Sequence, residues 1–146
     1  MCILDEAHLL EKETIEEFHF LLNYRFDSES SMALVLVGQS ELWDKLKQQR
    51  YAAVRQRIDL CCMLHPLDRA ETERYIRSHL EYAGGKMDIF TDVAIDVIHK
   101  GSHRIPRTIN RICEKSLAYA SQQGKRLIDE HTVFYVTEHE LLGNNV

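Results

Sequence analysis

Residues 1–8 read MCILDEAH: four apolar residues, Met1 to Leu4, lead directly into the carboxylate pair Asp5 and Glu6. A short apolar run bounded by polar residues is typical of a buried strand. In open α/β sheets, ligands bind beyond the carboxyl ends of the strands. The sequence therefore predicts that Asp5 holds Mg²⁺ at this edge, directly or through water, and that Glu6 polarises an attacking water.

This arrangement matches a Walker B motif, in which a strand delivers an acid to nucleotide-bound Mg²⁺. An alternative interpretation is a polar cap that follows a strand. The letters DEAH at 5–8 also match the DEAH box of helicases, but no further helicase motif accompanies them. A P-loop ATPase also needs Gly-x-x-x-x-Gly-Lys-[Ser/Thr] to hold the phosphates, and the 146-residue sequence does not contain that loop.

The pattern of the first 66 residues predicts an α/β architecture. After the first strand we expect a helix over 14–24, a loop over 27–31, a strand over 33–37, a helix over 40–49 and a third strand over 58–64. The apolar run ALVLV at 33–37 is typical of a central strand covered on both faces. Strands that alternate with helices are most simply parallel.

From about residue 67 onward the periodicity is helical. Asp68 and Glu71 have the spacing of a capping box, so a helix is expected to begin there and to end before Gly84. Three further helices are expected at Thr91, Pro106 and Asp129. The sequence thus predicts two parts, an α/β core over 1–66 and an all-helical part over 67–146.

Composition narrows the class of protein. With 45% hydrophobic and 28% charged residues, the chain resembles a soluble globular protein, and no apolar stretch is long enough for a bilayer span. A net charge of −5 argues against nonspecific nucleic-acid binding by the whole chain. No signal peptide is visible, so we expect a cytoplasmic protein. We expect reduced core cysteines at Cys2, Cys61, Cys62 and Cys113.

Polar residues after the second expected strand form another candidate. Gln39 should lie beside Asp5 and Glu6, where it would position a water or cap the following helix. Farther along, Arg55 and Arg57 offer forked donors that suit phosphate oxygens. The alternative for both arginines is a surface position near a helix end, which is favourable to the helix dipole.

Arg107 lies in the first turn of the helix expected at Pro106. The helix macrodipole disfavours a cation there, so this residue is a functional candidate, and with the uncapped turn it would form an anion site. Basic residues also cluster around it and around Arg57, and each cluster is either a solvated face or a phosphate contact. His8, His65 and His99 are expected to be hydrogen-bonded structural residues rather than ligands.

Several spaced motifs carry a resemblance to a known family: CILDEAHLL at 2–10, FHFLLN at 18–23, LVGQSEL at 36–42, QRI at 56–58 and RIPRTIN at 104–110. The chain resembles the AAA+ ATPases of the general secretion pathway protein A type, which are akin to the helper ATPases of bacterial transposons. The resemblance implies the C-terminal half of a parallel-sheet P-loop AAA+ core, followed by an all-helical lid subdomain.

The resemblance also implies roles for the candidate residues. The acid pair corresponds to Walker B, and Gln39 to the sensor 1 position. Arg57 is the best match to an arginine finger, with Arg55 as its rival. Arg107 corresponds to sensor 2, which reaches from the lid onto the nucleotide of its own subunit. Such ATPases form rings or filaments in which one subunit's finger reaches the next subunit's ATP.

ATP and Mg²⁺ are therefore the expected cofactors of a full-length protein. The family's P-loop should lie upstream of Met1, so we expect either a truncated gene product or a start codon placed too late. Two functions remain open. One is an ATPase that couples turnover to assembly with DNA and a transposase, or with secretion-system proteins. The alternative is a non-catalytic remnant that acts only as an assembly or interaction module.

Overall fold

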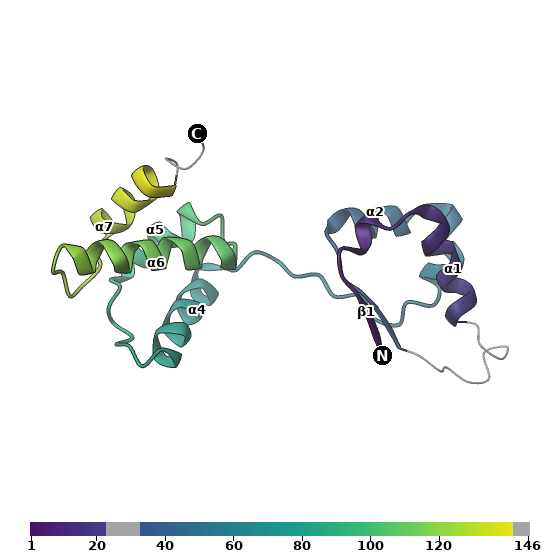
Figure 1. Ribbon diagram of the computed structural model, residues 1–146, viewed down its shortest axis with the longest axis horizontal. Helices are drawn as coiled ribbons and strands as arrows, with labels where there is room; N and C mark the ends of the chain where they lie inside the picture. Colours follow the sequence, from purple (N-terminus) through teal and green to yellow (C-terminus); the bar gives the residue numbers. More distant parts are fainter. Residues whose placement is uncertain (23–32, 142–146) are drawn as a thin grey trace. The chain divides into compact units, whose positions relative to one another are not determined.

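A computed structural model describes residues 1–22 and 33–141. The chain divides into two compact units, Met1–Met63 and Leu64–Val146 (Figure 1). The first unit contains the short sheet and the second is helical. The loop predicted over 27–31 lies outside the described residues. Among the described helices, none is both long enough and apolar enough to cross a membrane.

The sheet of the first unit consists of β1 (Cys2–Leu4) and β2 (Leu34–Leu36). The two strands pair in parallel, with Ile3 opposite Val35, which confirms the predicted strand direction. The helices of this unit are η1 (Ala7–Leu9), α1 (Lys12–Leu22), α2 (Ser40–Leu46), η2 (Gln49–Tyr51) and α3 (Ala52–Arg55). The order β1, α1, β2, α2 is that of a parallel α/β unit.

One face of this sheet is covered and the other is open. The small core of the unit contains Ala7, Ile15, Leu42, Leu46, Tyr51 and Val54. On the opposite face, Ile3 is 57% exposed and Val35 is 40% exposed. The prediction that the strand over 33–37 is covered on both faces is therefore wrong for the part of the chain that is described. Alternation along each strand puts every second apolar side chain on the open face.

The predicted strand over 58–64 does not form. A strand requires a neighbouring strand for its backbone hydrogen bonds, and the described sheet has no third member here. Leu60 is 84% exposed and Leu64 is 92% exposed. The core positions predicted for Cys61 and Cys62 are also wrong. Both side chains are exposed, because the strand that would bury them does not form. Burial instead raises the pKa of the half-buried Cys113 thiol to about 12.

The second unit is the all-helical part that the sequence predicts. It contains α4 (Arg69–Tyr82), α5 (Asp92–Gly101), α6 (Pro106–Gln122), α7 (Glu130–Val136) and the π-helical η3 (Thr137–Leu141). The predicted helix starts are confirmed, because Asp68 forms its capping box with Glu71 and both Thr91 and Asp129 accept from backbone N–H groups. Pro106 occupies the first turn of α6.

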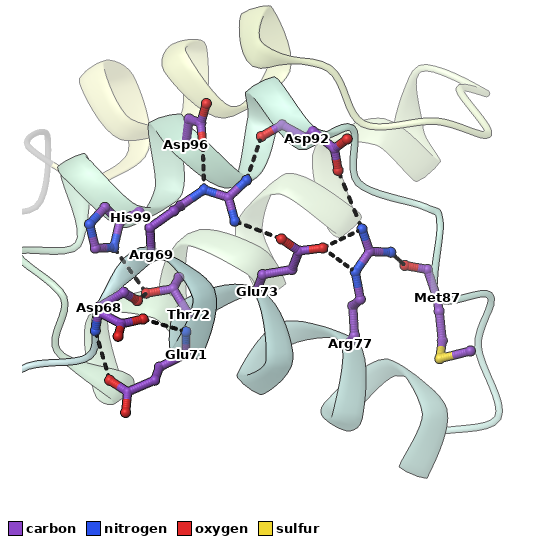
Figure 2. Close-up of polar contacts among 10 residues, drawn as sticks. All are labelled: Asp68, Arg69, Glu71, Thr72, Glu73, Arg77, Met87, Asp92, Asp96 and His99. Carbon is purple, nitrogen blue, oxygen red and sulfur yellow. Dashed lines mark hydrogen bonds and ion pairs between the residues drawn. The ribbon is translucent and has the colours of Figure 1, made fainter.

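A larger core holds these helices together, with Ile95, Ile98, Ile109, Ile112 and Val133 among its fully buried members. A charged network lies on the surface between α4 and α5 (Figure 2). Arg69 pairs with Asp96 of α5, and Arg77 pairs with Asp92 at 3.3 Å. Apolar burial supplies most of the stability and these polar contacts fix how α4 lies against α5.

Candidate active site

The acid pair lies directly beyond the carboxyl end of β1. Both side chains are solvent-exposed, and the Oδ1 atom of Asp5 accepts a hydrogen bond of 2.8 Å from the backbone N–H of Glu6. The backbone of Glu6 is left-handed, with φ of 52°, a conformation that residues other than glycine rarely adopt. The chain thus turns sharply after the strand, and the two carboxylates are exposed at the sheet edge.

The chain after β2 returns to the same edge. Val37 donates to the carbonyl oxygen of Leu4, and Ala7 donates to that of Val37, each at 2.8 Å. These bonds extend the ladder past the ends of both strands, so the segment that leads to Gln39 runs beside the turn that follows β1. The strand order predicts that Gln39 lies beside Asp5 and Glu6, and the place of its side chain stays a prediction.

His8 connects the two strand ends. Its Nδ1 atom lies 3.4 Å from Oε2 of Glu6 and also 3.4 Å from the backbone nitrogen of Gln39, which donates to it. The imidazole is largely enclosed, with a side-chain exposure of 12%, while that of Glu6 is 61%. His8 is therefore a hydrogen-bonded residue, as the sequence predicted, but it also contacts both candidate positions of the site.

Gly38 permits the close approach of these segments. A Cβ atom at this position would lie 3.1 Å from the backbone nitrogen of His8 and 3.1 Å from a methyl group of Leu42. Contacts that short require the neighbours to move, and the backbone nitrogen cannot move without breaking the local turn. A glycine is thus needed here for space rather than for an unusual backbone angle.

Lys45 of α2 holds the turn formed by η1, which follows the acid pair. Its Nζ atom donates to the carbonyl oxygens of His8 at 2.8 Å and Leu10 at 2.9 Å, which satisfies two acceptors that the short helix η1 leaves open. Sequence reasoning counted Lys45 only as one member of a basic cluster. The signal that it missed is its half-buried position on the inner side of α2, where a lysine needs acceptors.

The donor set at the edge suits a metal that arrives with a nucleotide. Asp5 and Glu6 supply hard carboxylate oxygens, which Mg²⁺ prefers. Within the described residues no three His, Cys, Asp or Glu side chains gather closely enough to hold a metal alone. Mg²⁺ commonly binds through one or two carboxylates together with phosphates and waters, so the residues present fit a nucleotide-bound ion better than an all-protein site.

Arg55 and Arg57 have different environments. The guanidinium of Arg55 donates to the carbonyl oxygens of Leu46 at 2.8 Å and Lys47 at 2.9 Å, where α2 ends. These bonds satisfy terminal carbonyls and place a cation at the negative end of the helix. Arg57 is half-buried in the turn that follows α3, and its backbone N–H donates to Val54. The helix-end interpretation thus holds for Arg55.

Arg107 is exposed in the first turn of α6, in the second unit. The helix has no acidic residue in that turn and no side-chain cap from Ile105. Directly before it, His103 and Arg104 are both left-handed, with φ of 52° and 67°. A hollow of about 400 Å³ beside this turn is lined by His99, Lys100, His103 and Arg104. Its basic lining fits an anion.

Comparison with known proteins agrees with this architecture. A family model described as an AAA domain matches residues 1–46. General secretion pathway protein A of Aeromonas hydrophila is 35% identical over 126 residues, which are 86% of this chain. The chain spans 23% of the length of that relative.

A solved structure of a RuvB mutant from Thermotoga maritima has a TM-score of 0.68 and 19% sequence identity. It covers 93% of this chain and the chain covers 43% of it, which supports a partial parallel-sheet P-loop AAA+ core with a helical portion. The sequence motifs, the AAA-domain match and the 35% identity to general secretion pathway protein A together support the similarity of this chain to the AAA+ ATPases of the general secretion pathway protein A type, and the RuvB structure shows the matching fold.

Proposed function

We propose that this chain forms the Walker B, sensor and lid regions of an ATPase that couples ATP binding and hydrolysis to assembly. The observation that supports this proposal is the parallel pairing of β1 with β2, because Asp5 and Glu6 follow the carboxyl end of one strand and Gln39 follows that of the other. In the proposed division, residues 1–66 belong to the nucleotide-binding core and residues 67–146 to the lid. We place the protein in the cytoplasm.

Each candidate residue has a distinct role in this proposal. Asp5 holds Mg²⁺, directly or through water, and Mg²⁺ supplies charge neutralisation for the phosphates when it is bound. Glu6 accepts a proton from the attacking water, and Gln39 orients that water. Arg107 contacts the nucleotide of its own subunit from the lid.

Arg57 is the proposed finger that stabilises phosphoryl charge in a neighbouring subunit. The choice of Arg57 rests on its match to the family motif at 56–58, while Arg55 has a structural role at the end of α2. A finger in trans requires a homo-oligomer, a ring or filament with a head-to-tail interface.

We further propose that the 146-residue chain alone turns over no ATP, since it contains no Gly-x-x-x-x-Gly-Lys-[Ser/Thr] to hold the β- and γ-phosphates. The alternative, a non-catalytic assembly module, rests on the same observation. Partners from a secretion system follow from the name of the 35% identical relative. A second set of proposed partners, DNA and a transposase, is implied by the family resemblance.

The test uses a longer version of the chain that carries a Gly-x-x-x-x-Gly-Lys-Thr segment, with the 146-residue chain as the matched control. The long version should hydrolyse Mg²⁺-ATP and the control should not. Arg57→Ala should lower the rate by about 10³-fold or more while nucleotide binding persists. Arg107→Ala should weaken both binding and turnover.

Mixing two inactive variants then tests the trans arrangement. Assemblies of Arg57→Ala and Glu6→Gln proteins contain some sites with one subunit's Glu6 and its neighbour's Arg57, so part of the activity should return. Co-assembly without any recovered activity would show that Arg57 does not act in trans. If the long version hydrolyses no ATP, the non-catalytic assembly module remains as the proposed function.

A further inference from the structure

We infer that Lys45 is a positioning residue of the candidate site, because its side chain fixes the turn that begins at Glu6 against the helix that begins after Gln39. The catalytic meaning rests on the proposed function, in which Glu6 accepts a proton from water and Gln39 orients that water. Lys45 is assigned no contact with the water or the nucleotide, and it acts through the backbone of the turn. Its effect on the turn is a property of the chain and can be measured without nucleotide.

The turn after β1 is the short 3₁₀ helix η1, and its own backbone closes only the first part of it. The N–H of Glu6 donates to Oδ1 of Asp5 at 2.8 Å, and the carbonyl oxygen of Glu6 accepts from Leu9 at 2.9 Å. The carbonyl oxygen of Ala7 accepts from Leu10 at 3.3 Å. Because hydrogen-bond geometry in 3₁₀ turns is poor, these bonds alone hold Glu6 only weakly in its left-handed conformation.

Lys45 closes the second part of the turn. Its Nζ atom donates to the carbonyl oxygens of His8 at 2.8 Å and Leu10 at 2.9 Å. Both acceptors follow the carbonyl oxygens that the backbone of η1 satisfies. The side chain of Lys45 is half-buried, and hydrogen bonds from a charged donor are shorter and stronger than those between neutral groups. One side chain thus holds the end of the turn that the backbone leaves open.

The helix α2 connects this contact to the other half of the site. Gln39 is the N-cap of α2, and Lys45 lies in the last turn of the same helix. Lys45 is also the i,i+3 neighbour of Leu42, which is buried in the core that includes Ala7 of η1. Since residues on one short helix keep fixed relative positions, Lys45 determines where the turn after the acid pair lies relative to Gln39.

Helix stability alone does not explain these two bonds. A cation in the last turn of a helix is favourable to the dipole wherever its side chain points. Lys47 shows that arrangement at the same helix end, because its Nζ atom pairs with Asp44 at 2.9 Å and its side chain is 57% exposed. Lys45 instead donates to carbonyl oxygens of a different element. The two lysines therefore separate a charge at the helix end from a contact with the turn.

The first experiment compares NMR amide signals of the 146-residue chain in Lys45→Met and Lys47→Met, without nucleotide. Methionine keeps most of the side-chain length and removes the donors. In Lys45→Met we expect a displaced amide signal at Glu6. Hydrogen exchange at Ala7 and Leu9 should be faster by about 10-fold or more, the size expected when a charge-assisted bond is lost. Signals of β2 should stay in place, and Lys47→Met should change none of these signals.

Unchanged signals and exchange rates in Lys45→Met would overturn the role of Lys45. Lys45→Gln is the milder variant if Lys45→Met does not fold, because glutamine loses the charge but keeps an amide donor. It should displace the same signal and speed the same exchange to a smaller extent. A Lys45→Gln protein with the wild-type values would overturn the role as well.

The second experiment uses the longer version that carries a Gly-x-x-x-x-Gly-Lys-Thr segment, at a temperature well below its unfolding midpoint. Lys45→Met should lower kcat by about 10²-fold, the cost of misplacing a reacting group by about 1 Å, with KM for ATP near the wild-type value. A purely stabilising role leaves kcat unchanged under these conditions, so a wild-type kcat in Lys45→Met would refute the positioning role.

The two experiments separate this inference from the proposed function. If the longer version hydrolyses ATP and Lys45→Met does so equally well, the positioning role fails and the proposed function stands. If the longer version hydrolyses no ATP, the proposed function fails, and the amide signals of the 146-residue chain decide whether Lys45 fixes the turn.

Discussion

Glu73 and Arg77 form an ion pair across one turn of α4, with a distance of 2.7 Å between Oε1 of the carboxylate and a terminal guanidinium nitrogen (Figure 2). The other carboxylate oxygen of Glu73 accepts from Arg69 at 2.9 Å. Both arginines continue to α5, where they contact Asp96 and Asp92. One carboxylate thus organises the two cations that attach α4 to α5.

Glu73→Gln should make the second unit less sensitive to acid. Hydrogen bonds from Arg77 and then Arg69 lower the pKa of Glu73 below its usual 4.5. A lowered folded-state pKa means that the stabilisation is present above pH 4.5 and is lost as the pH falls through the folded value. Solvent screens this half-exposed group, so we expect Glu73→Gln to lower the free energy of unfolding by about 1 kcal/mol or less at pH 7.

Urea unfolding at pH 7 and pH 3 measures this difference. The wild-type protein should lose stability between the two values by more than the variant does. Glu114→Gln, which removes an exposed carboxylate from α6, is the matched control and should keep the wild-type pH dependence. Equal acid sensitivity in the wild-type protein and Glu73→Gln would contradict the role of the ion pair.

Asp129→Ala should destabilise the start of α7. The carboxylate of Asp129 accepts from the backbone N–H of Thr132 at 2.9 Å and from its hydroxyl at 2.7 Å. Loss of an N-cap of this kind costs about 1 kcal/mol. Thermal unfolding checks the value, with Asp88→Ala as an exposed loop control that should stay within about 0.5 kcal/mol of wild type.

Gly38→Ala should disturb the candidate site more than its small size suggests. The added methyl group would press on the backbone nitrogen of His8 and on Leu42, each at 3.1 Å. Overpacking of this kind costs about 1–3 kcal/mol. We expect a lower denaturation midpoint for the first unit and shifted amide signals for His8 and Gln39. Unchanged signals at both positions would show that the turn absorbs the methyl group freely.

The two units should exchange their amide hydrogens at different rates. Among the described residues, ten buried side chains form the core of the helical unit, whereas six form that of the α/β unit. Since the larger core makes opening more costly, amides in α5 and α6 should exchange more slowly than those in β1 and β2. Slower exchange of the β1 and β2 amides would reverse this ranking.

Local signals along the chain predicted the helical unit well. Asp68, Thr91 and Asp129 mark helix starts because their short side chains bond nearby N–H groups, and Pro106 marks another because it has no N–H to satisfy. These effects depend on residues three or four positions apart, so a single sequence contains them. The parallel direction of β1 and β2 followed equally from the intervening helix.

Features that depend on distant partners could not be predicted in the same way. The apolar run over 58–64 indicates a capacity for burial, but a strand forms only beside another strand. Cys61 and Cys62 lie in this run, so they stay exposed when the strand does not form. His8 shows this at the site. Its place two residues after Glu6 was visible, while its contact with Gln39 arises from the pairing of β1 with β2. The roles of Asp5, Glu6, Gln39, Arg57 and Arg107 stay predictions.

The two left-handed residues before α6 have a consequence for protein engineering. Each non-glycine residue in that region costs on the order of 1 kcal/mol, so His103 and Arg104 make the loop less stable than a glycine pair would. A screen for heat-resistant variants should therefore select glycine or asparagine at these positions. Every such gain would remove a side chain that lines the hollow of His99, Lys100, His103 and Arg104, so a more stable loop should also be a less basic one.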